Sequence, residues 1–149
     1  TDLEMLISET GAATNVAILP TVVGDSRQLG QLFQNLLSNA IKFRQTSVRP
    51  IINIRSTHVT CLDLPEDIKP SRAAVAYHRI DVADNGIGFE QRYAHRIFQV
   101  FQRLHGKSHY AGTGIGLAIC KKVVANHGGD IVASSQPGQG ATFSIYLPF

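Results

Sequence analysis

The stretch GTGIGLAI, residues 112–119, places three glycines within five positions and then continues into apolar residues. Glycines on this spacing can let a phosphate approach the backbone, because the first turn of a helix offers unpaired N–H groups and the positive end of a dipole. They can equally allow no more than a flexible turn before a core helix. A dinucleotide fingerprint and a P-loop are both excluded, since neither G-x-G-x-x-G after a strand nor G-x-x-x-x-G-K-[ST] occurs here.

The segment from Asp25 or Ser26 to about Arg44 has the clearest helical pattern in the chain. Apolar residues recur there at steps of three and four, which predicts one broad apolar face. These residues are Leu29, Leu32, Phe33, Leu36, Leu37, Ala40 and Ile41. Asn35 and Asn39 lie one helical turn apart at the border of that face. A side chain at such a border is half-buried and can still reach a ligand.

Strands and helices alternate along the rest of the chain without forming a doubly wound pattern. The expected elements are the end of a helix at 1–10 closed by Gly11, a strand at 13–18, antiparallel strands at 51–60 and 73–84, a short helix near 92–99, a helix at about 114–127, and a hairpin of 130–135 with 141–148. The polar connector at 61–72 joins the two antiparallel strands.

Length, charge and cysteine content limit the class of protein. A chain of 149 residues with 44% hydrophobic and 17% charged residues is expected to form one globular domain. The net charge of +3 is spread along the chain rather than gathered in a stripe, so no nucleic-acid partner is expected. Cys61 and Cys120 are expected to be reduced, structural thiols of a cytoplasmic chain. No apolar run has the length of a membrane span, although the parent protein could still be membrane-anchored.

Four segments occur in a particular order: NLLSNAIKF at 35–43, DNGIGF at 84–89, IFQVFQRL at 97–104 and GTGIGLAI at 112–119. This order resembles the nucleotide-binding domain of sensor histidine kinases, whose motifs are the N box, the first G box, the F box and the second G box. The wider group is the GHKL, or Bergerat, ATP-binding superfamily. The N box is most similar to those of phytochrome-like and hybrid sensor kinases.

The resemblance covers the chain from about residue 13 to residue 148 and implies its fold. The implied fold is an α+β, two-layer α/β sandwich (the Bergerat fold), with a mixed, largely antiparallel sheet and helices on one face. Residues 11–149 would form the ATP-binding domain. Residues 1–10 would be a linker or the end of a preceding dimerisation helix.

The same resemblance implies a role for individual residues. Asp84 would accept a hydrogen bond from the adenine amino group, and Phe43 would pack beside the adenine ring. Asn39 would bind Mg²⁺ through its amide oxygen, while Asn35 and Lys42 would complete the catalytic set near the phosphates. Phe43 as an ordinary core residue and Lys42 as a solvated helix end are the alternatives. The implied ATP-binding residues are Asn35, Asn39, Lys42, Phe43, Asp84, Gly86, Gly88, Arg103, Lys107, Gly112, Thr113, Gly114, Gly116, Leu117 and Thr142.

The residue at position 35 separates the kinases from their ATPase relatives. In the ATPases, a glutamate one helical turn before the magnesium-binding asparagine activates water. Here that position is Asn35, and an amide does not accept a proton near neutral pH. The expected reaction is therefore phosphoryl transfer to a histidine. A GHKL-type ATPase and an interaction module that no longer binds nucleotide are the alternatives.

Residues 102–113 resemble the ATP lid of the family. His105 and His109 in this segment are expected to face solvent, and Phe98 and Phe101 to anchor the lid in the core.

The acceptor histidine of the family is missing from this chain. None of the histidines is followed by an H-E-x-x-x-P type box; these histidines are His58, His78, His95, His105, His109 and His127. The resemblance therefore implies a dimerisation and histidine phosphotransfer domain elsewhere in the same parent protein, and a response regulator downstream. The chain alone is expected to be monomeric and its parent homodimeric.

Overall fold

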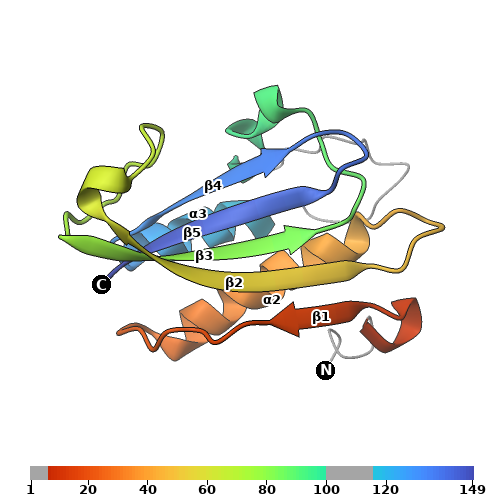
Figure 1. Ribbon diagram of the computed structural model, residues 1–149, viewed down its shortest axis with the longest axis horizontal. Helices are drawn as coiled ribbons and strands as arrows, with labels where there is room; N and C mark the ends of the chain where they lie inside the picture. The colour runs from red at the N-terminus through yellow and green to blue at the C-terminus, as the bar shows by residue number, and fades with distance from the viewer. Residues whose placement is uncertain (1–6, 100–115) are drawn as a thin grey trace.

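The computed structural model describes residues 7–99 and 116–149, which form a five-stranded sheet with the order β1-β2-β3-β5-β4 (Figure 1). The strands are β1 (Ala13–Val16), β2 (Ile51–Thr60), β3 (Ala76–Asp84), β4 (Asp130–Ser135) and β5 (Ala141–Pro148). β1 pairs parallel with β2, and the other three pairings are antiparallel. The prediction of a mixed, largely antiparallel sheet is confirmed.

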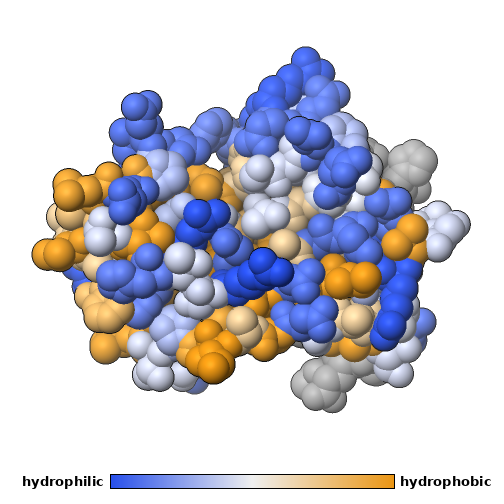
Figure 2. All heavy atoms as spheres, viewed as in Figure 1, coloured by the Kyte–Doolittle hydropathy of each residue, from blue (hydrophilic) through white to orange (hydrophobic). Residues whose placement is uncertain are grey.

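Two helices, α2 (Ser26–Lys42) and α3 (Gly116–Asn126), cover one face of the sheet and lie behind the strands in Figure 1. The opposite face, which Figure 2 shows, mixes polar and apolar side chains rather than presenting one apolar surface. On that face Asp81 Oδ1 accepts hydrogen bonds from Arg79 Nε at 3.0 Å and from Ser144 Oγ at 2.6 Å. The predicted two-layer α/β sandwich, with helices on one face, is confirmed.

The start and end of α2 agree with the sequence pattern. Asp25 is the N-cap, and its Oδ1 accepts hydrogen bonds from the backbone N–H groups of Arg27 at 2.9 Å and Gln28 at 3.1 Å. The helix ends at Lys42, where the N–H of Phe43 donates to Asn39 O at 3.1 Å. The helix is thus two residues shorter than the predicted end near Arg44.

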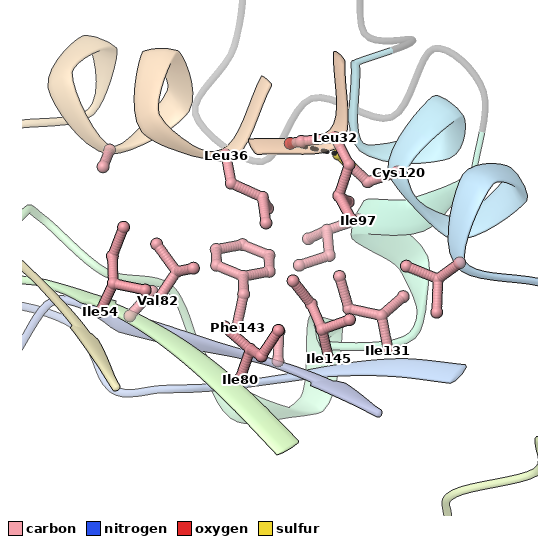
Figure 3. Close-up of a cluster of buried hydrophobic side chains, with 14 of the residues drawn as sticks. Leu32, Leu36, Ile54, Ile80, Val82, Ile97, Cys120, Ile131, Phe143 and Ile145 are labelled. Atoms are coloured by element: carbon pink, nitrogen blue, oxygen red, sulfur yellow. Dashed lines mark hydrogen bonds between the residues drawn. The ribbon is translucent and has the colours of Figure 1, made fainter. Parts of the chain in front are cut away.

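The core lies between the two helices and the sheet. Leu32 and Leu36 of α2 point toward Phe143 and Ile145 of β5, as Figure 3 shows, and Cys120 of α3 packs beside Leu32. The Cys120 thiol donates to Leu32 O at 3.7 Å. Burying large apolar side chains of this kind contributes roughly 1.5–3 kcal/mol each, so this contact holds α2 firmly against the sheet.

Two short segments differ from the predicted elements. In place of one helix near 92–99, the chain makes two 3₁₀ turns, η2 (Gln91–Tyr93) and η3 (Arg96–Phe98). Ala94 and Ile97, which are three residues apart, are both buried. A 3₁₀ conformation has three residues per turn and places such a pair on the same side. The strand predicted at 73–84 begins only at Ala76, because the Tyr77 hydroxyl accepts the Ala74 N–H at 2.9 Å and holds a turn there.

The first helical segment and the connector at 61–72 are each held by hydrogen bonds from backbone N–H groups. Residues 7–10 are helical and end at Gly11, which has a φ of +68°. The Ala12 N–H donates to Ile7 O at 3.2 Å, as in a Schellman motif. The connector contains a 3₁₀ turn, η1 (Cys61–Asp63), and the Lys69 N–H donates to Asp130 Oδ2 at 2.7 Å.

The two cysteines are free and lie in different environments. Cys120 is buried, and burial raises the pKa of its thiol to about 12. Cys61 is exposed, so the expectation that it is a structural thiol is wrong. Within residues 7–99 and 116–149, no helix is long and apolar enough to cross a membrane.

Candidate functional site

Asp84, the last residue of β3, lies in a strongly hydrogen-bonded corner of the molecule. Its Oδ1 accepts the Gly86 N–H at 2.8 Å and the Ala141 N–H at 3.3 Å. Burial raises the pKa of this carboxyl, and the two backbone donors oppose that effect. Within residues 7–99 and 116–149, no group donates a hydrogen bond to Oδ2 of Asp84. The carboxylate is therefore fixed through one oxygen and keeps the other for a ligand.

The glycines after Asp84 are required by close backbone contacts. A Cβ at Gly86 would lie 2.6 Å from the carbonyl oxygen of Phe43, and one at Gly88 would collide with the carbonyl oxygen of Gln136. Gly88 also has a φ of +68°, which side chains disfavour. The turn 84–88 is thus packed between the end of α2 and the loop that joins β4 to β5. We call this the base corner, because the family resemblance implies that the adenine base would bind there. It consists of residues 84–88 and the residues that contact them, which are Phe43, Gln45, Ser135, Gln136, Gly138, Gly140 and Ala141.

Ser135 and Gln45, which the motifs do not include, complete the base corner. The buried Ser135 Oγ accepts the Phe89 N–H at 2.8 Å and donates to Gly140 O at 2.6 Å. Gln45 donates from Nε2 to three backbone carbonyls, those of Asn85, Gly86 and Gly138. The partners of Gln45 and the Phe89 partner of Ser135 are distant in sequence, so no local spacing could have identified these contacts.

The second part of the site consists of Asn35, Asn39 and Lys42 on α2 and of Gly116. We call it the phosphate end, because the family resemblance implies that the phosphates would bind there. Asn35 Nδ2 donates to Gly116 O at 3.5 Å, a long hydrogen bond to the first turn of α3. The half-buried Asn39 side chain makes no hydrogen bond to the described residues, and Lys42 is exposed. The N box and the helical part of the second G box therefore meet at this end.

Three of the described site residues lie on α2, and the end of this helix contacts the base corner. Asn35 lies about 12 Å from Phe43, at about 1.5 Å per residue. The carbonyl of Phe43 accepts the Ile87 N–H at 2.8 Å, so the end of α2 joins the base corner directly. Thr142 of β5 pairs with Ala83, next to Asp84. α2 thus connects the two parts of the site.

Several predicted residues lie outside the described part of the chain. These are Arg103, Lys107, Gly112, Thr113 and Gly114, with the expected lid at 102–113, Phe101, His105 and His109. Gly116 and Leu117 are described and form the first turn of α3, where Leu117 packs against the core. Phe98 likewise packs against the core, its ring centroid 6.1 Å from that of Phe143.

The donor set at the phosphate end suits a hard cation that keeps part of its water shell. Asn39 offers an amide oxygen that is half-buried and has no hydrogen-bond partner in the described chain. Magnesium in proteins prefers oxygen ligands of this type and commonly shares them with substrate phosphates. Among residues 7–99 and 116–149, no three His, Cys, Asp or Glu side chains form a metal cluster. Asn39 is therefore a fitting single protein ligand rather than part of a closed metal cage.

The sequence matches a family model described as "Histidine kinase-, DNA gyrase B-, and HSP90-like ATPase" over residues 24–149. The chain belongs to this family. It is 44% identical over 147 residues to cyanobacterial phytochrome A of Nostoc sp., an alignment that covers 99% of this chain and 17% of that protein. It is 35% identical over 127 residues to sensor histidine kinase RcsC of Escherichia coli, covering 84% of this chain and 12% of that protein. The chain thus spans less than a fifth of the length of these larger relatives.

Solved structures place the chain in the histidine kinase branch of the family. The mycobacterial sensor histidine kinase MprB superposes with a TM-score of 0.75 at 26% identity, covering 98% of this chain and 90% of that one. Full-length ShkA in complex with AMPPNP superposes with a TM-score of 0.71 at 26% identity, covering 99% of this chain and 28% of that one. The resemblance to a histidine kinase ATP-binding domain is confirmed.

Proposed function

We propose that the chain binds Mg·ATP and donates the γ-phosphoryl group to a histidine on a separate dimerisation domain, in two-component signal transduction. The observation that carries this proposal is the position of α2. It ends at the half-buried corner of Asp84 and carries Asn35 beside the first turn of α3, with Asn39 between these two contacts. One helix therefore supplies both ends of a nucleotide site.

At the base corner, Asp84 accepts a hydrogen bond from the adenine amino group. Two backbone N–H groups hold Oδ1, which leaves Oδ2 to accept from the base. Guanine has an oxygen at the position of the adenine amino group, so its approach to a carboxylate is repulsive. Gly86 and Gly88 keep the backbone close to the base, Phe43 lies beside the ring, and Thr142 supports the corner.

At the phosphate end, Asn39 holds Mg²⁺ through its amide oxygen. Magnesium bound there supplies neutralisation of phosphate charge. Asn35 and Lys42 orient the phosphates from α2. The family resemblance assigns further phosphate contacts to these residues: Arg103, Lys107, Gly112, Thr113, Gly114, Gly116 and the Leu117 N–H. Catalysis is then positioning and charge compensation, which is general for phosphoryl transfer.

Asn35 favours the kinase reaction over hydrolysis. Its amide donates to Gly116 O, so it acts as a hydrogen-bond donor at the place where the ATPase relatives need a base. An amide cannot take a proton from water near neutral pH, so bound ATP is retained for transfer.

Three of the four histidines in the described residues are engaged within the domain, and the fourth, His95, is exposed; this supports an acceptor on another domain. Both ring nitrogens of His127 are engaged, Nε2 accepting the Asp25 N–H at 3.0 Å and Nδ1 lying 2.8 Å from Val123 O. His58 and His78 pack against the Phe149 ring, with centroid distances of 4.9 and 4.5 Å. We therefore propose that residues 11–149 are the ATP-binding domain, that residues 1–10 link it to the dimerisation domain of a homodimeric parent, and that a response regulator acts downstream.

The test combines the chain, γ-labelled ATP, Mg²⁺ and the separately produced histidine domain of the same parent. We expect label on the histidine domain, lost when the chain carries Asn39→Ala or Asp84→Ala, and retained with Gln34→Ala on the exposed side of α2. Failure of transfer with the correct partner would contradict the proposal.

Two other outcomes would identify the alternatives. Sustained release of phosphate by the chain alone, abolished by Asn39→Ala, would indicate a GHKL-type ATPase. Calorimetry that detects no binding of Mg·ATP would indicate an interaction module without nucleotide.

A further inference from the structure

We propose that Gln45 is a positioning residue for base recognition, holding the peptide group that in turn orients the Asp84 carboxylate. The inference rests on the proposed function, because it assigns Gln45 to the same adenine site. Gln45 lies beyond the end of α2 and outside the four sequence motifs.

Three backbone carbonyls converge on the Gln45 side-chain amide. Nε2 donates to Asn85 O at 3.2 Å, to Gly86 O at 3.1 Å and to Gly138 O at 3.3 Å. An amide nitrogen carries two hydrogens, so at least one of them is shared between acceptors. Without a donor at this point, three carbonyl dipoles would face one another, which costs free energy in a partly buried site.

The contact to Asn85 O connects Gln45 to Asp84 through one rigid unit. Asn85 O and the Gly86 N–H belong to the same planar peptide group. Gln45 binds the oxygen side of this group, and Asp84 Oδ1 accepts from its N–H side at 2.8 Å. Rotation of this peptide would withdraw the N–H from Asp84. Gln45 therefore holds the peptide plane between Asn85 and Gly86, and that peptide in turn orients the Asp84 carboxylate.

The surrounding loop has separate anchors, so the fold does not depend on Gln45. Asn85 Oδ1 accepts the Ile51 N–H at 2.8 Å, and Asn85 Nδ2 donates to Arg49 O at 3.0 Å. The carbonyl of Phe43 accepts the Ile87 N–H at 2.8 Å. Loss of the Gln45 amide is then expected to change the orientation of Asp84 more than the stability of the domain.

The test measures dissociation constants for ADP and for inorganic tripolyphosphate, both with Mg²⁺, in the full chain. Gln45→Met keeps the side-chain length and removes the donor, whereas Gln45→Lys restores a donor with three hydrogens. Gln139→Met is the matched control, an exposed glutamine in the β4–β5 loop whose side chain makes no hydrogen bond within the described residues. Thermal unfolding is recorded for every variant.

We expect Gln45→Met to weaken ADP binding about tenfold, which is the scale of one lost hydrogen-bonded contact, and to leave tripolyphosphate binding unchanged. On acidification, the ADP affinity of Gln45→Met should also begin to fall at a higher pH than that of the unsubstituted chain, because the Gly86 N–H would stabilise the ionised Asp84 carboxylate less well. Gln45→Lys should restore ADP affinity to within about threefold. Equal ADP affinity and pH profile in Gln45→Met and Gln139→Met would overturn the inference.

Two further results separate the possible failures. No ADP binding by the unsubstituted chain would contradict the proposed function itself, and with it this inference. If Gln45→Met does not fold, Gln45→Lys decides, because a folded lysine variant that has lost ADP affinity would overturn the role of the donor. Equal loss of ADP and tripolyphosphate binding would also overturn it, since the effect would not be confined to the base.

Discussion

The base corner lies beyond the C-terminal end of α2, the phosphate end lies along the C-terminal half of that helix, and the two regions are built in opposite ways. In the base corner, Asp84, Ser135 and Gln45 each make two or more hydrogen bonds to backbone groups. At the phosphate end, Asn35 makes a long contact of 3.5 Å to Gly116 O and a side-chain contact to Cys120, while the side chains of Asn39 and Lys42 make no hydrogen bond to the described residues.

In the proposed function, this difference assigns recognition of the adenine base to one region and phosphoryl transfer to the other. A carboxylate that is already fixed loses little entropy when it binds a base, so the base corner can select adenine in a preorganised state. The side chains of Asn39 and Lys42, which have no partner among the described residues, keep their hydrogen-bonding capacity for a ligand and its metal. In the proposed function, the phosphoryl group would therefore leave from the end whose side chains make the fewest contacts within the described residues.

The largest expected effect tests the rigidity of the base corner. Gly88→Ala should lower the free energy of unfolding by more than about 3 kcal/mol or prevent folding, because its Cβ would collide with the Gln136 carbonyl at a φ that favours glycine. Gly138→Ala is the control: its φ is also positive, at +77°, but its Cβ would meet open space. We expect it to cost only about 1 kcal/mol in urea unfolding. Equal losses would show that the corner is not tightly packed.

The second prediction concerns the phosphate end. Asn39→Ala should lower phosphoryl transfer on the order of 100-fold, equivalent to about 2.7 kcal/mol of transition-state stabilisation. The free energy of unfolding should change by less than about 1 kcal/mol, because the side chain has no hydrogen-bond partner in the described chain. Single-turnover transfer and urea unfolding measure the two quantities. A stability loss as large as that of Gly88→Ala would remove the contrast between the two ends.

A third prediction uses the pH dependence of Asp84. Burial raises its pKa in the folded chain, so the folded state binds the proton more tightly than the unfolded state. Its favourable contribution to stability is therefore present below the unfolded pKa and is lost as the pH rises through the folded pKa. Affinity for ADP should change in the opposite sense and fall on acidification, because adenine requires the ionised carboxylate. Calorimetry and unfolding between about pH 4 and 7 measure both trends, and Asp84→Asn should flatten them.

The smallest expected effect uses a glycine on α2. Gly30 is exposed in this helix, and a Cβ there would meet no atom within 4 Å. Gly30→Ala should raise the free energy of unfolding by about 0.5–1 kcal/mol without changing the affinity for ADP. A change in affinity would indicate that flexibility of α2 contributes to binding at the phosphate end. The midpoint of urea unfolding and an ADP titration provide the test.

Elements with a clear periodicity could be predicted from the sequence, and contacts between distant segments could not. The strand predicted at 51–60 has those bounds, and the helix capped by Asp25 was correctly placed because its apolar positions repeat at helical steps. The two 3₁₀ turns at 91–98 were mistaken for one helix, since spacing alone does not distinguish them.

In the candidate site, too, local motifs could be predicted from the sequence and contacts between distant segments could not. The four motifs identify Asn35, Asn39 and Asp84, and the structure places the two asparagines in the C-terminal half of α2 and Asp84 in the corner where that helix ends. The Gln45–Asn85 and Ser135–Phe89 contacts join residues 40 or more positions apart, although Ser135 also contacts the nearby Gly140. Those contacts exist only after the sheet has formed, so the sequence has no local signal for them.

Helix α2 fixes the spacing between Asn35 and Phe43. Each residue of a helix advances about 1.5 Å and turns about 100°, so one residue inserted in this interval would put the Asn35–Gly116 contact out of register with the Phe43–Ile87 contact. Substitutions within the interval leave this spacing unchanged. The number of residues between the two contacts therefore sets the length of the proposed nucleotide site.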